Sequence, residues 1–375
     1  MSKPEDYTVG WICAISTEYT AATASLDEEH EPPTHLPPNH KNDYTLGKMG
    51  QHNVVISVLP MGEYGTSSAA QVAEGMVHAF PNIRLAFMVG IGGGAPSAKH
   101  DIRLGDIVVG IPHNGRGGIL QYDFGKTIQD QSFQQTGFTN QAPTFLRTPV
   151  SGLASQYERK GNPIDRLVTE LLVRYPRLRK KYSRPDPATD RLYKSDVVHP
   201  GESDGVAESS CAVACGERAE ALVLRAPRTD EEDDPAIHYG LIASANQLMK
   251  DARVRDEFAR KHGVLCFEME AAGLVNHFPC LVVRGICDYA DSHKNKEWQG
   301  YAAMTAALYA KELLGRIVPQ VAAQQEKITQ VLKGGDTYHN STVNNYTTQG
   351  DNVRFDGNNY GVQVGMNHGD ITNNR

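Results

Sequence analysis

Two apolar segments in the C-terminal half of the chain end in acidic residues. Residues 264–267 lead into Glu268 and Glu270, and residues 280–286 lead into Asp288. Both segments have the length and composition of buried strands. Ligands of open α/β sheets bind in the crevice beyond the carboxyl ends of the strands, and a carboxylate there is costly without a ligand or a partner. We therefore expect these three acids to face a binding site.

A structural role is the alternative for each of these acids, because one of them could cap a helix or pair with Arg284. Glu18 poses the same question. It follows a predicted buried strand at residues 9–15, and Ser16 or Thr17 could N-cap the next helix with Glu18 in its first turn. A second possibility is that Glu18 faces the same crevice as the other acids.

A glycine-rich segment follows another predicted strand, at residues 85–89. Gly92 and Gly93 lie in the sequence GIGGGAP, where glycines let the backbone approach a ligand and point its amides into a cleft. The spacing is neither that of a dinucleotide-binding turn nor that of a phosphate-binding P-loop. The alternative is a flexible connection. Arg103 is close to this segment in sequence.

The remaining elements must position these residues. Hydrophobic periodicity predicts a hairpin (44–49 and 53–59), helices (66–80, 163–180, 251–261 and 298–318) and a strand (237–243). Residues 112–160 are predicted as long loops over one face, and 183–236 as a polar, partly mobile insertion.

Composition limits the class of protein. The chain has 375 residues and a net charge of −7, which argues against general nucleic-acid binding. We expect a soluble cytoplasmic protein, because no signal peptide and no membrane-spanning segment is evident. Its six cysteines are interpreted as mostly reduced thiols. Cys211, Cys215 and His199 would need a fourth ligand to form a zinc site, and none can be assigned, so no metal is predicted.

Four segments in this order, IGGGAP, ASANQLM, CFEMEAAG and RGICDYAD, resemble the purine nucleoside phosphorylase/nucleosidase superfamily. The greatest similarity is to its fungal branch, which is often attached to NLR-type immune receptors. The resemblance covers residues 7–318. It implies a three-layer αβα sandwich around a mixed, partly barrel-like sheet, a catalytic domain over residues 1–320, no cofactor, and a homo-oligomer.

The resemblance also implies roles for the acidic residues. Asp288 would donate a proton to N7 of a purine, and its identity favours adenine over 6-oxopurines. Burial disfavours the ionised form of a carboxyl group, so an aspartate in such a place can remain a proton donor near neutral pH. Glu270 would accept hydrogen bonds from the ribose hydroxyls. Other residues that the resemblance places around the substrate are Met269 on the sugar face, Phe267, Glu268 and Leu248 along the base and sugar, and Asn246 where the family often has an aspartate.

The segment after the first strand decides the reaction type. Glu18 resembles the glutamate with which nucleosidases activate water, with Gly92 and Gly93 around the water or the sugar, whereas phosphorylases hold phosphate with glycine and arginine there. A carboxylate would repel phosphate, so hydrolysis is favoured and phosphorolysis is the alternative. Arg103, with Lys99 and His113, could contact the 5′-phosphate of a nucleotide such as AMP or ATP. The alternative is that these three residues are solvated surface charges. A non-catalytic nucleotide sensor is the alternative of another class.

The C-terminal segment differs from the rest of the chain. Residues 321–333 are predicted as a linker. Residues 334–375 are rich in Asn and Gly and cannot bury enough apolar surface to fold alone. Their pattern resembles the amyloid-signalling motifs of fungal immune receptors, and such segments can stack as cross-β structure. A receptor of the NLR type with a matching motif would then cluster an effector enzyme; the alternative is a disordered tail.

Overall fold

The computed structural model describes residues 3–331, except 34–35, 39, 132, 201–210, 212–214, 216–219, 230 and 295. The strands are β1 (Val9–Cys13), β2 (Glu28–His30), β3 (Tyr44–Met49), β4 (His52–Val58), β5 (Leu85–Gly94), β6 (Ile107–Gly110), β7 (Ile119–Gln121), β8 (Gly125–Lys126), β9 (Gln134–Gln135), β10 (Ile237–Ser244), β11 (Val264–Glu268) and β12 (Leu281–Asp288). The helices are α1 (Ser16–Ala24), α2 (Thr66–Ala79), α3 (Thr144–Lys160), α4 (Ile164–Arg174), α5 (Arg179–Tyr182), α7 (Ala252–His262), α8 (Gln299–Leu314) and α9 (Pro319–Gln324).

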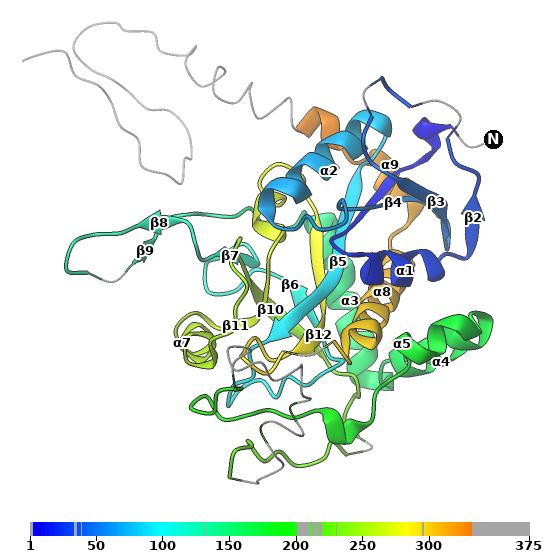
Figure 1. Cartoon of the computed structure of the whole chain (residues 1–375). Coiled ribbons are helices and arrows are strands. Elements are labelled where there is room, and N and C mark those ends of the chain that lie inside the picture. The colour runs from blue at the N-terminus through cyan, green and yellow to red at the C-terminus, as the bar shows by residue number, and fades with distance from the viewer. Residues whose placement is uncertain are drawn as a thin grey trace, which may run out of the picture. The chain divides into compact units, whose positions relative to one another are not determined.

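A mixed sheet organises these elements, with the strand order β11-β10-β6-β12-β5-β1-β4-β3-β2 and β7 beside β10. Strands β4, β1, β5 and β12 are parallel, whereas β6 runs antiparallel to β12. The sheet curls back on itself because β11 pairs with β5 as well as with β10. Helix α2 packs on β1 and β4, and α8 packs on β5 and β12 (Figure 1). The predicted αβα sandwich with a partly barrel-like sheet is confirmed.

The central strands are apolar because both of their faces are covered. Every residue of β1 and of β12 is buried, which is typical of parallel strands between two layers of helices. Helix α8 is rich in alanine, so its backbone comes close to β12. A Cβ atom at Gly285 would collide with the backbone carbonyl of Ala302 on α8. Small residues at this contact therefore let the helix lie close against the strand.

Several predicted boundaries are wrong. A helix, α3, occupies residues 144–160, where long loops were expected, and a single proline, Pro149, lies inside it. The helix predicted at 163–180 ends at Arg174, and Pro176 begins a separate 3₁₀ turn, because proline cannot continue the hydrogen-bond ladder. The glycine segment is not a loop, since β5 continues through Gly94 and pairs with β12.

The chain stays on this domain past the linker predicted to begin at residue 321. Helix α9 starts at Pro319, and Ile328 is buried with its amide bonded to the Ile83 carbonyl at 2.9 Å. The predicted amyloid-like segment, 334–375, lies outside the described residues. None of the helices in the described part of the chain combines the length and the apolar character needed to cross a bilayer.

Much of the predicted insertion, 183–236, is packed where it is described. Arg225 pairs with Asp190 at 3.0 Å, and Arg228 pairs with the buried Asp106 at 2.5 Å. The indole of Trp298 donates to Thr189 at 3.0 Å. Ion pairs and hydrogen bonds, rather than an apolar core of its own, therefore attach this segment to the sheet.

Candidate active site

A single arginine lies at the centre of the buried acidic residues. Arg284 on β12 has no exposed surface, and Glu268 accepts a hydrogen bond from its Nη2. Glu270 Oε2 lies 3.5 Å from the same nitrogen, and Glu18 Oε1 lies 3.9 Å from Nη1. A Cβ atom at position 90 would collide with both Arg284 and Glu18, so a larger residue at this point of β5 would displace these two side chains. The three carboxylates thus converge on one guanidinium group.

These charges do not balance, because three carboxylates face one cation. Burial opposes the charge of Arg284, but Glu268, Glu270 and Glu18 together raise its pKa well above the ordinary value. Burial, reinforced by repulsion from Glu268, raises the pKa of Glu270 to about 7. Glu270 therefore exchanges a proton near neutral pH, and perturbed pKa values of this kind cluster at functional sites.

Glu18 both caps a helix and belongs to this cluster. Its carboxylate accepts from the amides of Ala14 at 2.6 Å, Ile15 at 3.1 Å and Ile91 at 2.8 Å. The N-cap of α1 is Ile15, so the prediction of Ser16 or Thr17 as the cap is wrong. Burial nevertheless raises the pKa of Glu18, against the opposing effects of Arg284 and the three amides. Capping and membership of the site are therefore not exclusive alternatives.

Glu268 and Glu270 have different surroundings. Besides Arg284, Glu268 accepts from the amides of Glu270 at 3.1 Å and Ala271 at 3.0 Å, which starts the 3₁₀ turn Ala271–Gly273. Glu270 accepts from the Gly65 amide at 3.2 Å. The oxygens of Glu268 are thus largely engaged within the protein, which leaves Glu270 better placed to meet a ligand.

Asp288 lies at the end of β12, next to Gly93 of β5. Gly93 pairs with Asp288 on one side and with Phe267 on the other. A Cβ atom at Gly93 would lie 2.7 Å from Asp288 Oδ1, so the strands approach closely here. A register shift between Ile286 and Asp288 interrupts the pairing, and such bulges re-aim a side chain.

The Asp288 carboxylate already has partners. Lys294 Nζ lies 2.8 Å from Oδ2, and the Ala290 amide donates to Oδ1 at 2.8 Å. Asp288 also lines a cavity of about 250 Å³ whose other lining residues include Tyr193, Cys211 and His293. Lys294 was not among the predicted site residues, although a lysine six residues after a predicted acid could have indicated an ion pair with it.

The other predicted residues lie at varying distances from this centre. Phe267 is buried beside Gly93, Met269 is half-buried, and Leu248 is 50% exposed. The side-chain oxygen of Asn246 accepts from the amide and hydroxyl of Thr66, so it ties the end of β10 to the start of α2.

Arg103 is not among the partners of the carboxylate cluster. Its guanidinium pairs with Asp101 at 2.5 Å and donates to the Ala226 carbonyl at 2.7 Å. Gly92 pairs with Ile286, and a Cβ atom there would lie 3.0 Å from the Phe267 carbonyl oxygen. The structure therefore brings together the predicted acids, Phe267 and the glycines, and leaves Arg103 in an ion pair of its own.

The sheet and its flanking helices define the class of fold, that of nucleoside phosphorylases and nucleosidases. The solved structure of the 5′-methylthioadenosine/S-adenosylhomocysteine nucleosidase of Helicobacter pylori in complex with a pyrrolidine ligand superimposes with a TM-score of 0.50. The two share 14% sequence identity, and the match covers 82% of this chain and 98% of that one. At this identity the similarity establishes the fold alone.

Two sequence relatives are more specific. The chain is 45% identical over 317 residues to a nucleotide-binding leucine-rich repeat (NLR)-like protein of Hyaloscypha variabilis, covering 84% of this chain and 30% of that protein. It is 32% identical over 119 residues to the ATP nucleosidase Cap17 of Escherichia coli strain KTE188, covering 29% of this chain and 24% of that protein. The chain thus spans less than a third of either relative. No protein-family model matches it.

Proposed function

We propose that this protein hydrolyses the N-glycosidic bond of purine nucleosides or nucleotides, with a preference for adenine. One observation carries the proposal: Glu18, Glu268 and Glu270 converge on the buried Arg284, on the strand that ends at Asp288. Similarity to nucleosidases in fold and in sequence supports the same reaction. Two separated acids, one to protonate the base and one to activate water, are the minimum that this chemistry requires.

The reaction breaks the bond between C1′ of the sugar and N9 of the base. Asp288 donates a proton to N7, so the base leaves as a neutral molecule. Water attacks C1′, and Glu18 accepts the proton that the water loses. A base with a raised pKa works closer to neutral pH than an ordinary glutamate, which suits Glu18 for this role.

Lys294 constrains the proton donor. Lys294 Nζ lies 2.8 Å from Asp288 Oδ2 and so occupies one oxygen of the proposed proton donor. Binding of the base must therefore displace Lys294 from Asp288. Lys294 lies in the segment that follows β12, and a shift of this segment would suffice.

The remaining residues bind the substrate. Glu270 accepts from the ribose hydroxyls, Met269 packs on the sugar, and Phe267 and Leu248 line the base. Gly92 and Gly93 have no side chains, so the sugar can lie directly against the backbone of β5. Glu268 serves mainly to hold Arg284 and the 3₁₀ turn, because its oxygens are already bonded. Asn246 positions the loop before α2.

Hydrolysis is favoured over phosphorolysis by the charges around the water site. Phosphate would have to lie near Glu18, and the arginine closest to Glu18 is surrounded by three carboxylates. Coulomb repulsion between phosphate and these carboxylates, about 4 kcal/mol for a pair of charges 4 Å apart at an effective dielectric of 20, disfavours such a complex.

The 5′ substituent and the biological setting belong to the proposal as well. The relative named ATP nucleosidase supports a nucleotide substrate for this protein. The NLR-like relative supports the proposal that this protein is an effector in an immune receptor system. With Arg103 paired to Asp101, Lys99 and His113 are the remaining predicted contacts for a 5′-phosphate. Both side chains are exposed.

Adenine release tests the reaction. The full chain is incubated with adenosine, AMP, ADP or ATP, with and without phosphate, and free base is measured by chromatography. Release without phosphate is the expected result. Release that depends on phosphate would replace hydrolysis by phosphorolysis, and no release, although the nucleotide binds, would support a sensor instead.

A further inference from the structure

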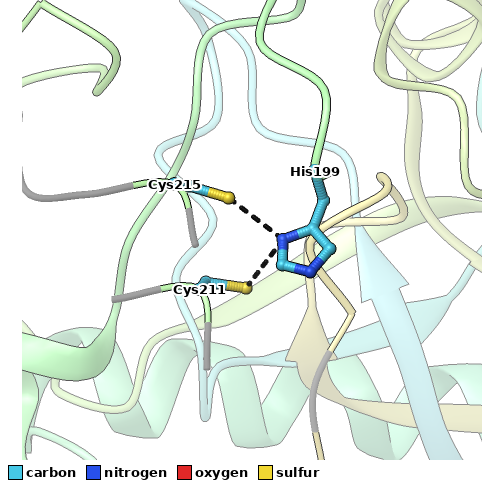
Figure 2. Close-up of side chains that lie close together, drawn as sticks. All are labelled: His199, Cys211 and Cys215. Carbon is cyan, nitrogen blue, oxygen red and sulfur yellow. Dashed lines mark hydrogen bonds between the residues drawn. The ribbon is translucent and has the colours of Figure 1, made fainter. Parts of the chain in front are cut away.

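Three potential metal ligands that are distant in sequence lie together in the insertion. Cys211 and Cys215 are one helical turn apart, with the Cys215 amide donating to the Cys211 carbonyl at 2.9 Å, so both thiols lie on one face. Figure 2 shows both sulfur atoms directed at the ring of His199. Its Nδ1 atom lies 3.0 Å from Cys215 Sγ and 3.8 Å from Cys211 Sγ.

These separations match the geometry of a tetrahedral metal. Zinc–sulfur bonds of about 2.3 Å and zinc–nitrogen bonds of about 2.0 Å place neighbouring ligand atoms roughly 3.4–3.8 Å apart. The three ligand atoms here all lie within 4.8 Å of one another. A cation could therefore be accommodated if the ligand atoms shift by no more than about 1 Å.

A fourth ligand, missing from the sequence pattern, is close by. The His293 side chain is buried, and within the described part of the chain neither of its ring nitrogens has a hydrogen-bond partner. The His293 ring stacks on Tyr193 and lies edge-on to His199, with centroids 5.7 Å apart. Its Nδ1 faces Asp291 at 3.6 Å. A carboxylate behind an imidazole is the usual support for a metal-binding histidine.

We propose that His199, Cys211 and Cys215 bind a divalent transition metal of the zinc type, with His293 as the fourth ligand. Two thiolates and two imidazoles form one of the common structural zinc sets, and soft sulfur ligands select against magnesium and calcium. With Nδ1 directed at Asp291, Nε2 of His293 would bind the metal, which gives a partner to a buried nitrogen that has none within the described part of the chain.

The metal would fasten the insertion to the segment that follows β12. The His199 amide already donates to Ser292 Oγ at 2.9 Å, and Cys211 Sγ contacts the His293 carbonyl at 3.6 Å. Lys294, the partner of Asp288, is the next residue after His293. Cys211, His293 and Asp288 also line one cavity. Metal binding would therefore fix one wall of the cavity that contains Asp288, which goes beyond the proposed hydrolysis and does not depend on it.

Metal content is the direct test. The full chain is purified under reducing conditions without a histidine tag, and its metals are determined by mass spectrometry. We expect about one zinc per chain, as for a structural site. Replacement of zinc by cobalt should give thiolate-to-cobalt charge-transfer absorption together with the intense visible bands of tetrahedral cobalt.

Substitutions assign the ligands. C211S and C215S should each abolish stoichiometric zinc and weaken the charge-transfer band, whereas H293A should retain the band and lower zinc affinity. Control variants are C280A, which removes a buried thiol outside the cluster, and H78A on the exposed side of α2. Both should keep full zinc content.

The wild-type protein by itself can overturn the proposal. One contradicting outcome is reduced, folded protein that contains no metal and shows no charge-transfer band after addition of cobalt. Another is a disulfide that forms readily between Cys211 and Cys215 in protein that does not bind added zinc. Zinc content that survives both cysteine substitutions would also contradict it. Adenine release is measured separately, so a failed hydrolase assay leaves these outcomes unaffected.

Discussion

Two clusters of polar side chains in this protein are built in opposite ways. The carboxylate cluster around Arg284 comes from β12, the first turn of α1, and the end of β11 with the turn after it; it is buried and is held by backbone amides. The cluster of His199, Cys211 and Cys215 is half-buried and lies in the insertion, whose described residues include no named strand. The sheet register positions the first cluster, whereas in the second the proposed cation would link the insertion to the segment that follows β12.

The charges of the two clusters also differ. The carboxylate cluster has more anions than cations and is stable only because one guanidinium group and several amides offset the repulsion. The histidine and thiol cluster includes no carboxylate and no arginine among its three members. A preorganised, charged site suits catalysis, since it needs no rearrangement during the reaction. A site whose ligands come from separate segments suits a structural clamp.

The largest expected effect is on catalysis. D288N removes the proposed proton donor but preserves size and polarity, so adenine release should fall by roughly 10²–10⁴-fold, the usual contribution of general acid catalysis. Nucleotide binding, measured by calorimetry, should persist. D27N is the control, because Asp27 forms a partly exposed ion pair with Lys311 far from β12 in sequence. Unchanged release by D288N would exclude Asp288 as the acid.

Next in size is the effect of the central cation on stability. R284M leaves three buried carboxylates without their partner and should lower the free energy of unfolding by about 3–5 kcal/mol. Denaturant unfolding measures this change. R166M is the matched control, because Arg166 forms an exposed pair with Glu170 and should cost less than about 1 kcal/mol. Equal effects of the two substitutions would contradict the central role of Arg284.

Removal of the proposed metal should have a smaller effect. A ligand at a hundred times its dissociation constant contributes about 2.7 kcal/mol to stability, so a chelator should lower the melting temperature by several degrees. The same chelator should leave the melting temperature of C215S unchanged. A chelator effect of the same size on C215S would place the metal elsewhere.

A further effect concerns pH. The pKa of Glu270 is raised from 4.5 to about 7, so the folded protein binds more protons than the unfolded chain between these values. Its contribution to stability is therefore complete below pH 4.5 and is lost as the pH rises through about 7. E270Q should flatten the melting temperature over this range, whereas E170Q, in an exposed ion pair, should not. Identical pH profiles of E270Q and wild type would refute the shift.

Much of the fold could be predicted because its signals are local. Alternating or continuous apolar runs predicted β1, β5, β11 and β12, and the acids at their ends predicted the neighbourhood of the site. Helix α3 was missed because its sequence contains Pro149 and many polar residues, and it forms by packing against the domain. The glycines were read as a loop, although a strand needs them where Arg284, Glu18 and Asp288 come within contact of its backbone.

The sequence by itself determined which side chains follow which strand, since this depends only on chain order and on hydrophobic pattern. Only the tertiary structure decided which atoms meet. The pairing of β5 with both β11 and β12 brings Phe267 and Asp288 to the two sides of Gly93, and places Glu268 on Arg284. Tertiary structure also brings together His199, Cys211 and His293, whose contacts link segments far apart in the chain. Such contacts depend on strand register and on burial, which no local pattern specifies.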